Sequence, residues 1–274
     1  MRTIDFSKKI PSLIDLMDQA DSIAMKYYLP ENEEALDIKE KDGEGPVTKA
    51  DLEINNYLSA ELKKIIPAAG IVSEEGQTID FNRSLLWQID PIDGTKEFIK
   101  RNDEFTIMLA LVLENFPILG FISHPPTGRL FYGGPNFGCF LRDKNSDQVI
   151  DLNLSEPVEF NFNHIKALIS RSHHSVKDEE ALQKLEVHER IPLGSGGYKM
   201  CQLLMGKADL FLKTSPNTYT WDVAAGHALL MARGGIVTGF DGKPIDYRDI
   251  SSFSRGGLFA SRSIRFWNQV FNSK

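Results

Sequence analysis

Apolar residues recur at helical spacing in the first quarter of the chain. They form one stripe over residues 10–28 and a second over residues 48–65, where Pro67 ends the pattern. Each stripe predicts an amphipathic helix with one buried face. The stretch between them, residues 30–46, is charged and contains glycine, so we expect a mobile loop there.

Further along, short apolar runs are separated by Gly, Pro and Asn turns, which is typical of strands. Five such runs predict a mostly antiparallel sheet, with strands at residues 70–73, 85–90, 105–113, 117–124 and 129–134.

Beyond about residue 150 the pattern changes to an alternation of strands and helices. We predict strands at residues 166–170 and 209–213, and helices over residues 176–187, 198–208 and 221–235. The last helix is apolar on nearly every face, which indicates burial. We therefore divide the chain into an N-terminal α+β subdomain, residues 1–150, and a C-terminal α/β subdomain, residues 151–274.

The composition, 42% hydrophobic and 25% charged among 274 residues, is that of a soluble folded protein with a sizeable core. A formal charge of −7 disfavours a nucleic acid polymer as partner and leaves a small anion open. Cys139 and Cys201 stand in no disulfide or zinc pattern. The longest apolar run, residues 107–113, is too short to span a bilayer, and the first residues lack the apolar core of a signal peptide. We expect a cytoplasmic protein and leave peripheral membrane association open.

Acidic residues stand beside predicted strand ends and helix starts at four separate places. Thr48 and Asp51 match a capping box, which is the simpler interpretation of that pair. Glu74 follows a short strand, where an acid is commonly just solvated. Taken singly, neither place indicates chemistry.

The stretch "LLWQIDPIDGTKEF" ends a strand on Asp90 and, across a proline turn, on Asp93. A tight turn explains one acid. Two acids across the turn can face one point, however, and Gly94 and Thr95 then start a helix whose free N–H groups suit an anion. Carboxylates beside an anion site require cations between them, so this arrangement indicates a metal.

Asp222 opens the apolar helix over residues 221–235. An N-terminal cap is again the simpler interpretation, but a carboxylate carried into the interior needs a strong partner. Hard carboxylate oxygens without Cys or His favour Mg²⁺. Two such ions about 3.5–4 Å apart can bind both the attacking and the leaving oxygen of phosphoryl transfer. The four places together indicate metal-assisted hydrolysis of a phosphate ester.

Several stretches together resemble the inositol monophosphatase superfamily. Its two signature patterns are similar to "WQIDPIDGT" and "WDVAAGHALLMARGG", and the resemblance covers nearly the whole chain in the same order. Within the superfamily, "DGTKEFIKRNDEFTIMLAL", "SRSHH" and "DGKPIDY" look most like the 3'(2'),5'-bisphosphate nucleotidases of the CysQ type. The resemblance implies an α/β (α+β) fold, a layered α-β-α-β-α sandwich.

The resemblance also implies a site with two or three Mg²⁺ ions. Their ligands would be Glu74, Asp90, the carbonyl of Ile92, Asp93 and Asp222. Asp51 and Thr95 match the residues that orient and activate the attacking water, which replaces capping as the interpretation of Asp51; Glu74 is also counted as catalytic. The Gly94 and Thr95 amides would hold the scissile phosphate, and water would attack phosphorus in line.

The implied substrate is adenosine 3',5'-bisphosphate (PAP), cleaved to AMP and phosphate, with 3'-phosphoadenosine 5'-phosphosulfate (PAPS) as a further candidate. The residues matched to substrate contacts are Asp93, Gly94, Thr95, His173, Ser195, Lys199, Lys213 and Asp222. Ser195 and Lys199 stand one residue further apart than in the family pattern. Lys213 replaces a common Arg and lacks its planar fork. Lys96 and Glu97 are explained equally well as exposed helix residues or as substrate contacts.

Two other functions stay open at this point. One is a phosphatase of the same superfamily that acts on inositol monophosphate or a sugar phosphate. The other, more remote, is a phosphometabolite sensor that binds without catalysis. The resemblance further implies inhibition by lithium and a monomer or homodimer, of which we favour the monomer.

Overall fold

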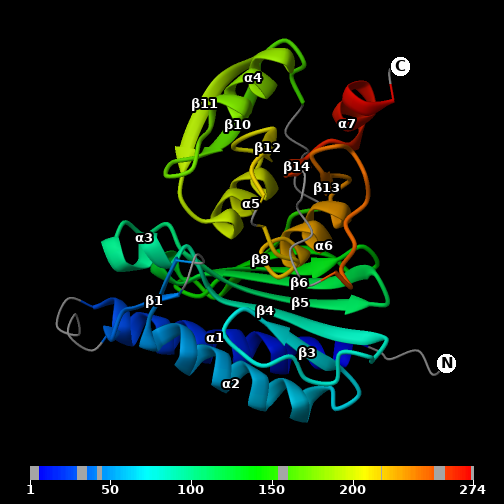
Figure 1. Cartoon of the computed structure of the whole chain (residues 1–274). Helices are drawn as coiled ribbons and strands as arrows, with labels where there is room; N and C mark the ends of the chain where they lie inside the picture. Colours follow the sequence, from blue (N-terminus) through cyan, green and yellow to red (C-terminus); the bar gives the residue numbers. More distant parts are fainter. Residues whose placement is uncertain are drawn as a thin grey trace.

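The computed structural model describes residues 6–29, 36–41, 45–153, 160–216, 218–249 and 257–272, packed as alternating layers of helices and sheets (Figure 1). The helices of the three helical layers are, in order, α1 (Ile10–Tyr28) and α2 (Lys49–Ile65); α5 (Gly196–Leu204) and α6 (Ala224–Ala232); and α4 (Val176–Lys184) and α7 (Ile264–Phe271). A seven-stranded sheet separates the first two layers, and a five-stranded sheet separates the last two. This arrangement confirms the α-β-α-β-α sandwich.

The larger sheet follows chain order from β3 to β9. Its strands are β3 (Gly70–Ser73), β4 (Leu85–Asp93), β5 (Thr106–Leu113), β6 (Phe116–His124), β7 (Arg129–Gly134), β8 (Gly138–Asp143) and β9 (Gln148–Asp151). β3 and β4 are parallel, and every later pair is antiparallel. The antiparallel sheet expected from the sequence is confirmed. It extends by two strands, β8 and β9, that the apolar pattern did not indicate.

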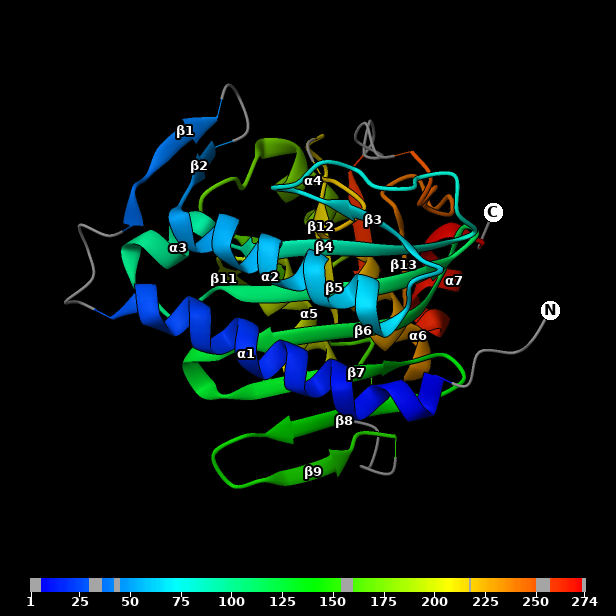
Figure 2. The same ribbon diagram turned by 90° about the horizontal axis from the view of Figure 1, so that it is seen from below.

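Both faces of this sheet are buried because its central strands are apolar at most positions on both faces. On β5, for example, Ile107 and Leu109 pack into the core shared with α1 and α2, whereas Met108 and Ala110 pack into the core shared with α5 and α6. Helices α1 and α2 cross one face side by side, and β9 lies at the edge beyond them (Figure 2).

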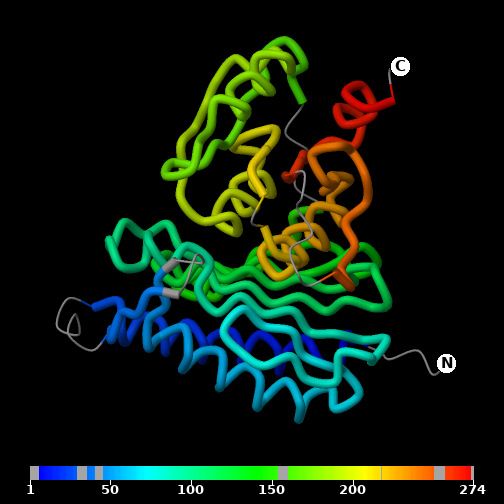
Figure 3. The backbone as a smooth tube through the Cα atoms, in the orientation of Figure 1, coloured from blue at the N-terminus to red at the C-terminus, as the bar shows by residue number. Residues whose placement is uncertain are grey.

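The second sheet is built from the later part of the chain, as the colours of the tube in Figure 3 show. Its order is β11-β10-β12-β14-β13. The bounds are β10 (Ile165–Ser170), β11 (Val187–Leu193), β12 (Leu210–Lys213), β13 (Ile236–Gly239) and β14 (Leu258–Ser261). β10 pairs in parallel with both β11 and β12, while β14 runs antiparallel to β12 and β13.

Helix α6 is buried between the two sheets, as its apolar sequence predicted. It approaches β6 closely at Gly120, where an added Cβ would stand 2.3 Å from the carbonyl oxygen of Ala225. The same core encloses Cys139 and Cys201, both free thiols with at most 1% exposure. Burial raises the pKa of Cys139 to about 12 and that of Cys201 well above its usual range.

Some boundaries differ from those expected. Residues 30–35 and 42–44 of the expected loop lie outside the described residues, but β1 (Lys39–Lys41) and β2 (Gly45–Val47) form an antiparallel pair within it. The helix expected up to residue 187 ends earlier, at Lys184, and the helix expected over residues 221–235 is confined to α6. Among the described helices, none combines the length and hydropathy needed to cross a bilayer. The subdomain division at residue 150 stays a prediction.

Candidate active site

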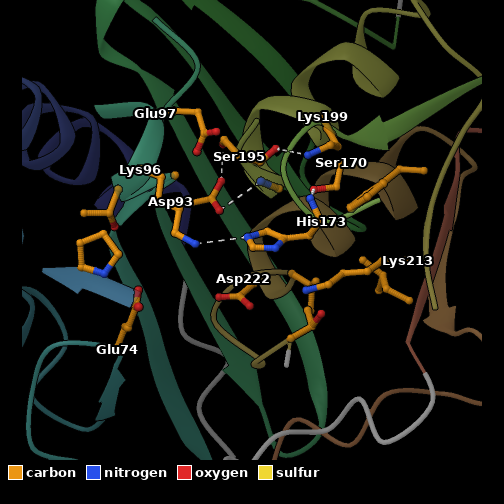
Figure 4. A pocket seen from close by; sticks show the side chains of 18 residues that line it. Glu74, Asp93, Lys96, Glu97, Ser170, His173, Ser195, Lys199, Lys213 and Asp222 are labelled. Atoms are coloured by element: carbon orange, nitrogen blue, oxygen red, sulfur yellow. Dashed lines mark hydrogen bonds between the residues drawn. The ribbon is translucent and has the colours of Figure 1, made fainter. Parts of the chain in front are cut away.

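A cleft of about 250 Å³ opens where the larger sheet meets the second half of the chain (Figure 4). It gathers the ends of β3, β4, β10 and β12 with the starts of α3 (Thr95–Lys100) and α5. The predicted site residues that line it are Glu74, Asp93, Gly94, Thr95, His173, Ser195, Lys199, Lys213 and Asp222. The structure therefore brings together in one place residues that are far apart in sequence.

Most of the acids lie at one edge of the larger sheet. Because β3 and β4 are parallel neighbours, Glu74 after β3 and the acids at the end of β4 reach the same edge of the sheet. Asp90 is only 2% exposed, and its Oδ1 has no hydrogen-bond partner. Its pKa is held well above the usual range, first by burial and then by the charges of Glu74, Asp93 and Asp222. A cation would relieve both conditions.

These acids do not form a ready-made ion cage. In the described ranges, no group of three or more His, Cys, Asp or Glu side chains is arranged to hold a metal. Like charges repel one another at close range, and the Asp93 carboxylate is directed toward α5. The charges of three other acids nevertheless raise the pKa of Asp90, so these side chains lie within electrostatic reach of it.

Asp93 is anchored by the segment that starts α5. Its Oδ1 accepts from the Gly196 N–H at 3.1 Å, and its Oδ2 accepts from the Gly197 N–H at 2.6 Å and from the Thr106 hydroxyl at 3.1 Å. The Ser195 hydroxyl also donates to Oδ2. Ser195 thus caps α5, accepting from the Tyr198 N–H, while it fixes a carboxylate of the cleft.

Asp222 lies in the turn just before α6, which corrects the expected position in the first turn of the helix. The N–H of Tyr219 donates to its Oδ2 at 2.8 Å. Burial raises the pKa of Asp222 to about 7, and the charge of Asp93 adds to this effect. The raised pKa shows that burial disfavours the charged form of this carboxylate, which is why a strong partner is expected for it from the sequence.

Asp51 does form the capping box that its local sequence indicated. Its Oδ2 accepts from the Thr48 N–H at 2.8 Å and from the Thr48 hydroxyl at 2.5 Å. At 1% exposure, burial raises its pKa to about 6. Thr95 Oγ1 donates to the Ile92 carbonyl at 3.2 Å. The Asp51–Thr95 pair implied by the resemblance is not among the hydrogen bonds of the described residues, and Asp51, Asp90 and Ile92 do not line the cleft.

Gly94 links β4 to α3 with a left-handed φ of 94°. A Cβ there would come within 3.0 Å of both the Glu104 carbonyl oxygen and the Ser195 side chain. Glycine is therefore required both by the turn and by the close approach of two other segments. The first N–H groups of α3, like those of any helix, have no partner within the helix.

Basic side chains enter the cleft from both sides: Lys199 and Lys213 come from the second half of the chain, while Lys96 lies on α3 beside the acids (Figure 4). Lys199 is 3% exposed and donates to the carbonyls of Gly194 at 2.6 Å and Ser195 at 3.0 Å, while burial lowers its pKa to about 8. Burial also lowers the pKa of Lys213. His173 is exposed, and its Nε2 stands 3.5 Å from Lys96 Nζ across the cleft (Figure 4). The pKa of His173 is lowered, first by partial burial and then by Lys96.

Several lining residues carried no decisive signal in the sequence. Lys96 is exposed at the rim, whereas Glu97 is buried, contrary to one of its two expected interpretations. Ser170 could have been found as the strand residue just before the loop that bears His173. Phe211 and Leu258 could not have been identified as site residues from the sequence, because they appear there only as apolar strand residues.

Comparisons with known proteins show the family to which the sequence is similar. The model of the inositol monophosphatase family matches residues 10–261. The 3'(2'),5'-bisphosphate nucleotidase CysQ of Escherichia coli (strain K12) is 32% identical over 255 residues, covering 92% of this chain and 99% of the relative. The CysQ of Salmonella typhimurium is 30% identical, covering 91% and 98%.

Solved structures show the same fold. The crystal structure of CysQ from Bacteroides thetaiotaomicron, described as a bacterial member of the inositol monophosphatase family, has a TM-score of 0.78 at 28% identity and covers 95% of this chain and 99% of that one. Extragenic suppressor protein suhB from Bartonella henselae has a TM-score of 0.79 at 20% identity, with 97% and 98% covered. The resemblance noted in the sequence is confirmed: the chain belongs to the inositol monophosphatase family.

Proposed function

We propose that this protein is a Mg²⁺-dependent 3'(2'),5'-bisphosphate nucleotidase that removes the 3'-phosphate of PAP to give AMP and phosphate, and that also accepts PAPS. The observation that carries the proposal is one cleft lined by both carboxylates and lysines. Relatives named as nucleotidases, similar over almost their whole length, support the choice of substrate.

The residues present fit a divalent cation. Asp90 is a buried carboxylate with one unpartnered oxygen and with Glu74, Asp93 and Asp222 close enough to raise its pKa. We assign the ion-holding role to these four acids and to the Ile92 carbonyl, an all-oxygen set that suits Mg²⁺. When bound, Mg²⁺ lowers the pKa of water and stabilises negative charge on the phosphoryl oxygens.

The chain's own residues would then orient the reactants. We assign Gly94 and Thr95 N–H groups to the scissile phosphate, and the Thr95 hydroxyl with Asp51 to the attacking water. The raised pKa of Asp51, about 6, brings it near the pH at which a general base is most effective. In the structure the Thr95 hydroxyl donates to the Ile92 carbonyl instead.

The lysines of the cleft favour a substrate with two phosphates over a monophosphate. Lys96, Lys199 and Lys213 line the cleft together with His173 and with the acids that would hold the cations. One phosphoryl group would be neutralised by the cations, which leaves these lysines for a second phosphate. We assign Ser195 to holding Asp93 as well as to the substrate side of the cleft.

A substrate panel tests the proposal. Initial rates are measured with Mg²⁺ on PAP, PAPS, inositol 1-phosphate and fructose 1,6-bisphosphate, and again after chelation of the metal. We expect the highest kcat/KM with PAP, no turnover without metal, and loss of most activity in Asp93→Asn with the fold intact. A strong preference for inositol 1-phosphate would reject the nucleotidase, and PAP binding without phosphate release would indicate a sensor. Cytoplasmic location, a monomeric state and inhibition by lithium stay predictions.

A further inference from the structure

Glu104 binds two segments that contribute residues to the cleft, and no assignment above uses it. It lies in the loop between α3 and β5, next to the fully buried Phe105, and its side chain is only 12% exposed. Phe105 packs in an aromatic cluster with Tyr28 and Phe98, so the loop is held firmly at this point. Glu104 therefore starts from a fixed backbone.

The two carboxylate oxygens of Glu104 bind two different segments of the second half of the chain. Oε1 accepts from the Arg171 guanidinium at 2.6 Å, two residues before His173. Oε2 accepts from the N–H of Gly194 at 2.5 Å, the residue before Ser195. A single side chain thus connects the larger sheet with both segments that carry the proposed nucleotide contacts.

Close packing prevents these segments from adjusting independently. A Cβ on Gly194 would come within 2.2 Å of Glu97 Cγ, so this turn lies directly against α3. Lys199 donates to the Gly194 carbonyl, so a shift of Gly194 also moves the partner of the Lys199 ammonium. On the other segment, the Arg171 N–H donates to the Leu193 carbonyl, which couples the two segments to each other.

A carboxylate is required at this point because both of its partners are donors. Gly194 offers an N–H and Arg171 an N–H of its guanidinium, so each oxygen of Glu104 must accept. A glutamine of the same shape keeps one acceptor but directs an NH₂ group at the other donor. Arg171 retains a second contact, to the Pro192 carbonyl at 3.3 Å, which does not involve Glu104.

We propose that Glu104 is a positioning residue for substrate binding: its carboxylate holds the Arg171–His173 segment and the Gly194–Lys199 segment in the arrangement that receives the nucleotide part of the substrate. The inference rests on the proposed nucleotidase function and adds a determinant of its specificity. Glu104 itself touches neither the acids nor the scissile phosphate in this scheme, so its loss acts on substrate binding rather than on the chemical step.

The test compares Glu104→Gln and Arg171→Met with the wild type. KM and kcat are measured with PAP, together with the melting temperature. Glu189→Gln is the matched control, because Glu189 forms a surface ion pair with Lys166 at 3.0 Å and is 43% exposed. Loss of one hydrogen bond to a charged group predicts a KM for PAP about tenfold higher in Glu104→Gln, with kcat within about twofold of the wild type. Arg171→Met should raise KM less, because the bond to Gly194 remains, and adding it to Glu104→Gln should change KM little further.

The outcomes separate the two ideas. Wild-type protein that prefers inositol 1-phosphate over PAP overturns the proposed function. Wild-type protein that prefers PAP, with an unchanged KM in Glu104→Gln, overturns the role of Glu104. A fall in kcat and melting temperature at constant KM also overturns it, because it shows a purely structural residue. If Glu104→Gln fails to fold, Arg171→Met alone decides, because the Arg171 side chain is 42% exposed and its replacement should be tolerated. An unchanged KM in Arg171→Met would then refute the role of Glu104.

Discussion

Replacing Asp90 by asparagine should weaken Mg²⁺ binding and stabilise the metal-free protein. In the metal-free protein this carboxylate is desolvated, lies near three other acids and has an unpartnered oxygen. Asparagine is neutral without taking up a proton, so the change removes the cost of holding this carboxyl among three other acids, and the free energy of unfolding without metal should rise. The same change removes one anionic ligand, and breaking a buried charge pair costs about 3 kcal/mol, or about 100-fold in affinity.

The size of the effect follows from linkage. At a Mg²⁺ concentration about 100 times the dissociation constant, binding stabilises the native state by about 2.7 kcal/mol, which is a rise of roughly 5–10 °C in melting temperature for a chain of this order. A 100-fold loss of affinity reduces this gain to about 0.4 kcal/mol, or about 1 °C. Thermal unfolding with and without MgCl₂, supported by calorimetric titration, measures both quantities.

Asp21→Asn is the control for this experiment, because Asp21 is also a buried carboxylate with an unpartnered oxygen but lies outside the cleft. It should keep the full Mg²⁺-induced shift. An Asp90→Asn protein that shifts as much as the wild type would refute the assignment of Asp90 to the cation.

Three further predictions concern stability, pH and catalysis. Burial raises the pKa of Asp21 from 3.8 to about 7, so the native state binds this proton more tightly than the unfolded chain. The contribution of Asp21 to stability should be full below pH 3.8, and about 4 kcal/mol of it should be lost as pH rises through about 7. Urea unfolding at several pH values should show this slope, and an equal slope in Asp21→Asn would contradict its origin. Gly120→Ala places a Cβ 2.3 Å from the Ala225 carbonyl oxygen and should cost about 1–3 kcal/mol in denaturant unfolding, whereas wild-type stability would show that α6 can shift freely. Thr95→Ala should lower kcat for PAP about 10²–10⁴-fold while Thr95→Ser retains most of it; an alanine variant within tenfold of the wild type would remove the hydroxyl from the mechanism.

The elements that could be predicted from sequence are those in which one local pattern decides. The apolar stripe of α1 and the apolar runs of β4 to β7 are visible in the local sequence, and their apolar residues are buried in the core. β9 is exposed at the sheet edge and β11 reads as the polar run "VHERIPL", so neither strand shows the alternation by which strands are found. Their pairing depends on neighbours that are distant in sequence.

The candidate site divides in the same way. Asp90 and Asp93 could be singled out because two acids end one buried strand, and the family motifs added the remaining acids. Asp93 accepts hydrogen bonds from Gly196 and Gly197, which are 103 and 104 residues away. No local sequence pattern indicates these contacts. The contacts of Glu104 with Arg171 and Gly194 span 67 and 90 residues and could be recognised only once the sheets were placed together.

The two buried thiols can be used to measure how often the native structure opens. Cys139 in β8 and Cys201 in α5 are both almost inaccessible, and a raised pKa keeps each of them protonated in the native state. An alkylating reagent should therefore modify them only in molecules whose central layer has come apart. The rate of modification would then measure how tightly a bound nucleotide or ion closes the whole sandwich, without any label or substitution.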